Sequence, residues 1–143
     1  MQFLVILLVI AAGMGLSVEA GLLGPLSGSV GKLWATFSIF SVGSVLSFIL
    51  MLFFSPRNTP SYLSQPAWTL IGGLLGPIYV VILAVTVPQI GIALTMVGVL
   101  AGQVGKSLII DHFGLLGMPH ARINPKRLIA LGFIVAAMIL MMI

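Results

Sequence analysis

Long apolar runs, broken by short polar segments, dominate the pattern along the chain. Residues 2–18, 33–56 and 58–105 carry no charged side chain at all. A helix crosses the roughly 30 Å hydrocarbon core of a membrane with about 20 apolar residues. The pattern therefore predicts an all-α integral membrane protein built as a bundle of transmembrane helices.

Turn residues divide these runs. Gly24 and Pro25, followed by a cluster of serines and glycines, predict the end of the first helix. The longest run, residues 58–105, exceeds a single span, and Pro88 divides it because its fixed φ suits the first turn of a helix. Asn124 before Pro125 has the pattern of a helix N-cap. The sequence predicts one domain of five helices, at about residues 2–23, 30–54, 66–87, 88–110 and 125–143.

Composition supports a membrane location. The 143 residues are 60% hydrophobic and 6% charged, against about 25% charged in typical soluble domains. Mean hydropathy is +1.30. The net charge of +4 comes from few, scattered basic residues, which does not indicate nucleic acid as a partner. The absence of cysteine excludes thiolate metal sites.

The basic residues predict an orientation. Five spans place the termini on opposite sides, and the side that includes the N-terminus has five basic residues against Lys32 alone on the other. By the positive-inside rule the N-terminus lies in the cytoplasm and the C-terminus outside. The five residues are Arg57, Lys106, Arg122, Lys126 and Arg127.

Gly105-Lys106-Ser107 matches the end of a Walker A loop, but its context does not. The first glycine of that motif falls at Leu100, and no strand and turn precede the fragment. The segment ends an apolar helix, so we expect Lys106 to extend its ammonium to the lipid headgroups.

Glu19 is the one acidic residue expected inside the membrane. Removal from water favours the neutral form of a carboxylate, which allows it to exchange a proton, and a cationic substrate can compete for the same group. The alternative places Glu19 at a solvated helix end with no role.

Four further residues are weaker candidates for a cavity lining. Ser41 belongs to a series of serines three residues apart, and Trp34 is either an interface anchor or a substrate-facing ring. Tyr79 follows Gly76 and Pro77, where a mid-span proline predicts a kink. Gln103 is polar but lies one turn from Lys106, so it faces either the cavity or the cytoplasm.

Small residues recur at alternating spacings of four and three along the predicted fourth helix. Such a stripe is typical of close helix packing, either within a subunit or across a dimer. Its members are Gly91, Thr95, Gly98, Gly102 and Gly105.

Residues with catalytic or metal-binding chemistry are sparse. Asp111 is expected to pair with Lys106 or with a loop arginine. His112 and His120 have no third ligand nearby in the sequence, so we predict no metal site and no cofactor. No hydrolase or protease motif is present, and the sequence does not indicate an enzyme.

Most of the chain, and most strongly the stretch from Trp68 to Gly117, resembles the YdcZ-type proteins of the drug/metabolite transporter superfamily. The matching motifs are Gly72-Gly73-Leu74-Leu75-Gly76, Pro88 to Gly91, Gly102-Gln103, and Ser107 to Gly114. The resemblance implies a five-helix half-transporter, distantly similar to small multidrug resistance proteins. It also implies an antiparallel pair, as a homodimer or with a homologous chain of opposite orientation. In the multidrug proteins an essential glutamate lies in helix one, and Glu19 is the matching residue.

These observations predict a transporter of small solutes in a bacterial-type inner membrane. It would export its substrate by alternating access as a dimer, with proton coupling through Glu19. The alternative is a non-transporting membrane subunit that assembles with or regulates a partner membrane protein.

Overall fold

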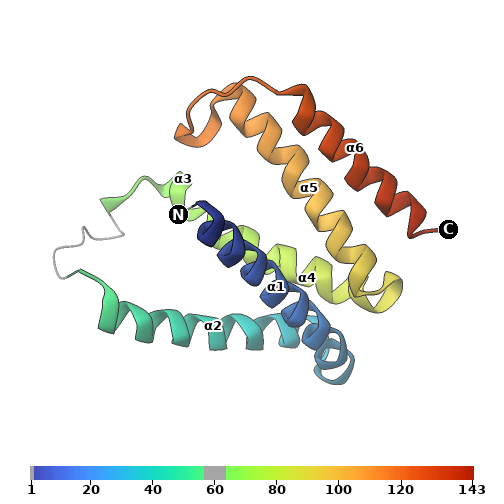
Figure 1. The fold of residues 1–143 in the computed structure, drawn as a ribbon. Coiled ribbons are helices and arrows are strands. Elements are labelled where there is room, and N and C mark those ends of the chain that lie inside the picture. Colours follow the sequence, from blue (N-terminus) through green and yellow to red (C-terminus); the bar gives the residue numbers. More distant parts are fainter. Residues whose placement is uncertain (1, 57–63) are drawn as a thin grey trace. The chain divides into compact units, whose positions relative to one another are not determined.

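The protein is mostly helical in the part of the chain that its structure, a computed structural model, describes: residues 2–56 and 64–143. No strand occurs in these ranges, which confirms the all-α prediction. The elements are α1 (Gln2–Val30), α2 (Lys32–Phe54), α3 (Ala67–Leu70), α4 (Gly72–Ile90), α5 (Ile92–Phe113), a 3₁₀ turn (Leu115–Gly117) and α6 (Pro125–Leu140) (Figure 1).

Within the described residues, four helices are long and apolar enough to cross a membrane. These are α1, α2, the segment Ala67–Ile90 and α5. The helix expected at residues 125–143 ends at Leu140 and has 16 residues, which is about 24 Å at the standard rise. It is shorter than the other four and falls below the length of a typical span.

The first helix does not end at Gly24 and Pro25, as the sequence suggested. It continues through both residues to Val30, with Pro25 inside the helix. Membrane helices tolerate proline because neighbouring groups satisfy the carbonyl that it leaves free. Gly24 also lies close to α4, since a Cβ there would sit 3.7 Å from Val87. The chain turns instead at Gly31, whose φ of 88° and ψ of 153° define a conformation almost confined to glycine.

The second predicted break is also displaced. Pro88 lies in the last turn of α4, which runs on to Ile90, so it does not begin the next helix. The break occurs at Gly91, with φ 81° and ψ 163°, and α5 begins at Ile92. Gly91 is therefore a turn residue and not part of a helical stripe.

The helix that carries Pro77 has its interruption at an unexpected place. A turn at Ile71 separates α3 from α4, whereas α4 continues through Pro77 without a break. Pro77 has no N–H to donate to the carbonyl of Gly73. A kink at Gly76 and Pro77 stays a prediction.

The chain folds into two compact units, residues 1–89 and 90–143. In the first unit α1 packs against α2, and α4 contacts α2 where the ring of Phe40 approaches Gly76. The buried residues on α1 and α4 recur at spacings of three and four, as expected for helix faces in contact. They are Ala20, Leu23 and Ser27 on α1, and Val80, Leu83, Ala84 and Val87 on α4.

The second unit is a helical hairpin of α5 and α6, which lie side by side (Figure 1). At one end a Cβ on Gly98 would lie 3.9 Å from the Sδ of Met138. At the other end Arg127 and Asp111 form an ion pair of 2.9 Å. Leu131, Ile134 and Met138 are half-buried, so one face of α6 packs along α5.

Asn124 caps α6, as the sequence predicted. Its side-chain oxygen accepts a hydrogen bond of 3.0 Å from the backbone N–H of Lys126, and Pro125 occupies the first helical position.

We expect Asn124→Ala to lower the free energy of unfolding by about 1 kcal/mol, because the first turn of α6 loses its side-chain acceptor. Thermal unfolding in detergent measures the change, with Asn124→Asp as the control that keeps an acceptor. Equal stability of Asn124→Ala and wild type would show that the cap does not hold α6.

Candidate functional site

Glu19 lies well inside α1 and not at its end. The helix continues for eleven residues beyond it, from Ala20 to Val30, which is about 16 Å at the helical rise. Glu19 is therefore not at the end of α1, and its position inside the membrane stays a prediction. Lys32 follows directly after the turn at Gly31 and marks the polar edge of this side of the unit.

The surroundings of Glu19 are apolar. Its side chain is half-buried, the next residue, Ala20, is fully buried, and so is Leu23 one turn further along. Among the described residues the ion pair of Asp111 and Arg127 stands alone, so Glu19 has no cationic partner there.

Tyr79 lies on α4, in the same compact unit as Glu19 on α1. The hydroxyl oxygen is buried and has no hydrogen-bond partner in the described part of the chain. Buried tyrosine hydroxyls ordinarily have a partner. The first unit thus contains two polar groups, one on α1 and one on α4, that the sequence singled out separately.

Ser41 lies at a comparable level of the unit. It follows Gly31 by ten residues and Glu19 precedes Gly31 by twelve, which are distances of about 15 Å and 18 Å along the two helices. Because α1 packs against α2, the half-buried Ser41 is the α2 candidate at the level of the carboxylate.

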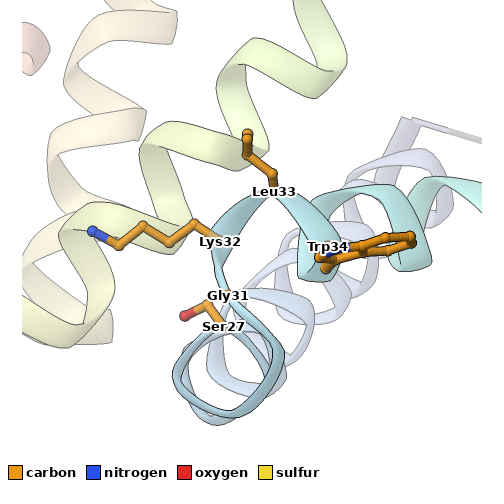
Figure 2. Close-up of a pocket in the computed structure, with 5 residues that line it drawn as sticks. All are labelled: Ser27, Gly31, Lys32, Leu33 and Trp34. Carbon is orange, nitrogen blue, oxygen red and sulfur yellow. The ribbon is translucent and has the colours of Figure 1, made fainter.

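Trp34 lies at a different level, next to the turn. Its ring is 66% exposed and meets Phe37 edge-on with centroids 5.9 Å apart. An open hollow of about 440 Å³ borders this turn, lined by Ser27, Gly31, Lys32, Leu33 and Trp34 (Figure 2).

The polar groups of this hollow do not converge. Figure 2 shows Lys32 and Trp34 extending to opposite sides of the turn, and the hydroxyl of Ser27 donates to the carbonyl of Gly24 at 2.8 Å. The geometry favours an interface anchor over a substrate-facing ring for Trp34.

Gln103 and the small-residue stripe belong to the second unit. Gln103 is exposed on α5. Thr95 is buried and its hydroxyl donates to the carbonyl of Gly91 at 2.7 Å, while Gly98 faces α6 through Met138. Gly102 and Gly105 have no atom within 4 Å of a Cβ placed on them. Packing of these two glycines across a dimer stays a prediction.

Asp111 has a different partner from those expected. It pairs with Arg127 in the first turn of α6, and not with Lys106 or a loop arginine. The reason is the return of the chain, which carries α6 back along α5 and is held by a hydrogen bond of 2.7 Å from the N–H of Ala121 to the Asp111 carbonyl.

His112, in the last turn of α5, and His120, in the loop that follows, come together with ring centroids 5.8 Å apart. Within the described ranges no group of three metal-ligating side chains forms. The histidine contact was not anticipated from the sequence, because it depends on the left-handed conformation of Gly114, with φ 60°.

Comparison with known proteins adds one finding. A family model with the description "Putative inner membrane exporter, YdcZ" matches residues 4–140. No curated protein and no solved structure gives a significant match.

Proposed function

The chain belongs to the YdcZ family of inner membrane exporters, and from this premise we propose that it exports small organic solutes by proton-coupled alternating access. The observations that support the proposal are the half-buried carboxylate of Glu19 on α1 and the buried, unpartnered hydroxyl of Tyr79 on α4, both in the first compact unit. Intramembrane acidic residues are costly and mark substrate or proton pathways.

The chemistry of these two groups favours a cationic substrate, such as an organic amine. A lone carboxylate can neutralise its charge with a proton or with a substrate cation, but not with both at once. The substrate can bind only after the proton has left the carboxylate. The movements of proton and substrate across the membrane are therefore coupled. The hydroxyl of Tyr79 can donate to the carboxylate or accept from an ammonium group.

We propose that the working unit is a dimer of oppositely oriented chains. The support is the resemblance to half-transporters, together with the apolar residues left exposed along α1 and α2 of the single chain. The unequal distribution of basic residues favours one fixed orientation, N-terminus in the cytoplasm, and hence a homologous partner of opposite orientation. Arg57, one of the residues behind that inference, lies outside the described residues.

Orientation has a direct test. A reporter fused after Ile143 should give a signal only outside the cytoplasm, because the positive-inside rule directs the basic loops inward. The control is a variant with added basic residues beside Lys32, which should reverse the orientation of the chain and is measured with the same reporter. Equal signals on both sides for the unmodified chain would instead indicate a dual-topology homodimer.

Proton flux in proteoliposomes tests the transport proposal. Wild-type protein is given an outward substrate gradient of organic cations, amines or neutral metabolites in turn, and a pH-sensitive dye reports proton movement. Flux driven by amines or cations and absent with neutral compounds is the expected result. Flux driven only by neutral compounds would contradict the proposal that Glu19 binds a cationic substrate.

No flux with any compound would contradict transport by this chain alone. It would favour the second candidate, a membrane subunit that acts with a larger partner protein. Co-purification from a native membrane then distinguishes a missing homologous half from an unrelated partner, because a homologous half restores flux when it is reconstituted with the chain.

A further inference from the structure

Large apolar side chains are exposed where the chain passes from α5 to α6. This region, residues 113–127, is the hairpin end and lies at one end of the two helices (Figure 1). Every residue from 115 to 130 is exposed. Apolar surface of this kind marks a contact with a membrane or with another molecule. The large apolar residues of the hairpin end are Phe113, Leu115, Leu116, Met118 and Ile123.

Leu116 has a backbone conformation that leucine rarely adopts. Its φ of 58° and ψ of 26° lie in the left-handed region, where a bulky side chain is strained. The side chain is 66% exposed, so it gains little packing within the hairpin in return. A surface outside the chain that takes up this side chain would offset the strain.

The hairpin end also carries an excess of positive charge. Arg122 lies in the loop, and Lys126 and Arg127 lie in the first turn of α6. Residues 113–127 include no acidic side chain. Arg127 is paired with Asp111 at the end of α5, whereas Arg122 and Lys126 are exposed and form no ion pair within the described ranges.

The second unit does not compensate this charge itself. Asp111 is the one acidic residue between positions 90 and 143, and Arg127 already neutralises it. The first turn of α6 has no acidic residue, although the dipole of a helix favours negative charge at this end and disfavours a cation such as Lys126. The hairpin end therefore offers two cationic side chains to an anion from outside the chain.

An anionic phospholipid matches both the charge and the apolar side chains. The helix α5 is long and apolar enough to cross a membrane and ends at Phe113, and a span that ends there places the next residues at the membrane surface. Segments that combine basic with large apolar side chains bind at the boundary of headgroups and acyl chains. A soluble anion would satisfy the charge but leave the apolar side chains in water.

We propose that the hairpin end binds anionic phospholipid, with Arg122 and Lys126 at the phosphate groups and Leu116 and Met118 against the acyl chains. A guanidinium group can bind a phosphate through two parallel hydrogen bonds, and Lys126 adds a second positive charge. Each basic residue near an anionic membrane surface raises the affinity about fivefold. This binding does not depend on transport, so it can be tested whether or not the proposed function holds.

A fluorescent label in the hairpin end tests the proposal in lipid vesicles. The chain has no cysteine, so Leu115→Cys takes a single label and leaves the four proposed contact residues in place. The vesicles contain equal amounts of phosphatidylglycerol, which is anionic, and phosphatidylcholine, which has no net charge. A small and equal fraction of one or the other lipid carries a nitroxide on its acyl chain, which quenches the label on contact.

We expect stronger quenching when the nitroxide is on phosphatidylglycerol. Arg122→Gln combined with Lys126→Gln should lower the affinity for phosphatidylglycerol relative to phosphatidylcholine about 25-fold, about fivefold for each charge. Lys32→Gln is the control, since it removes an exposed basic residue next to the turn between α1 and α2 and should leave the preference unchanged. Leu116→Gly keeps a residue suited to the left-handed conformation and should weaken quenching by both lipids.

Four outcomes would overturn the proposal. Equal quenching by the two lipids in the wild-type sequence would show that the hairpin end does not select an anionic headgroup. A preference that survives the double variant would place the phosphate elsewhere. A preference lost in inorganic phosphate, but kept in sodium chloride of the same ionic strength, would assign the two basic residues to a soluble anion. No quenching by either lipid would separate the loop from the membrane and favour a protein partner.

Discussion

Glu19→Gln is expected to abolish amine-driven proton flux while the protein still folds and inserts. Glutamine keeps the size and hydrogen-bonding capacity of the side chain but can neither exchange a proton nor neutralise a cation. Glu19 has no cationic partner among the described residues. Replacing its carboxylate by an amide therefore leaves no basic side chain there without an ion-pair partner. Flux in proteoliposomes should fall to the level of empty vesicles, and the circular dichroism spectrum should remain helical.

The chain provides a matched control. Asp111 is the other acidic residue of the sequence, and Asp111→Asn removes a carboxylate from the half-exposed pair with Arg127. We expect it to keep transport, because exposed ion pairs contribute at most about 1 kcal/mol to stability. Glu19→Asp should retain part of the flux. Full flux in Glu19→Gln would remove this carboxylate from the mechanism without excluding transport.

Tyr79→Phe separates the contribution of this hydroxyl from that of Glu19. Its hydroxyl has no partner in the described structure, so its removal should leave thermal stability unchanged or slightly raised. If the hydroxyl contacts the substrate, the variant should raise the substrate concentration needed for half-maximal flux. An unchanged concentration dependence would mean that Tyr79 serves packing alone.

Gly76→Leu should cause the largest loss of stability. A Cβ at this position would lie 3.2 Å from two ring carbons of Phe40, closer than carbon atoms normally approach, and leucine adds three more carbon atoms in the same direction. Overpacking of this kind costs about 1–3 kcal/mol. The α2–α4 contact should open, and the midpoint of thermal unfolding in detergent should fall.

Gly73→Leu is the control for helix propensity and added apolar surface. Gly73 lies one turn earlier in the same helix and has no atom within 4 Å of a placed Cβ. It should be neutral or stabilising, because leucine favours helix more than glycine does. Equal losses in both variants would show that the approach of Phe40 to α4 does not stabilise the fold.

The membrane class and the approximate helices follow from the sequence, but the positions of the turns do not. Prolines are the stronger sequence signal for a break, and they suggested turns at Pro25 and Pro88. Both lie inside helices, as membrane helices tolerate proline when other groups satisfy the freed backbone carbonyl. The breaks fall at Gly31 and Gly91, where the chain needs a conformation that only glycine adopts easily.

The sequence identified the residues of the candidate site one by one but did not predict how they are arranged in space. The sequence identifies Glu19 because a charged side chain inside an apolar membrane span is energetically unfavourable. Its position relative to Tyr79 depends on which faces of α1 and α4 meet, and apolar residues occur all round these helices. For the same reason the pairing of Asp111 with Arg127 required knowledge of how α6 returns along α5.

The continuation of α1 to Val30 has a consequence for the lipid around the protein. Its 29 residues measure about 43 Å, well beyond the roughly 30 Å of a hydrocarbon core, whereas the 16 residues of α6 measure about 24 Å. Long helices fit by tilting and short ones by thinning the bilayer around them. We therefore expect α1 to tilt in a bilayer of ordinary thickness, whereas α6 could span only where the bilayer is thinner.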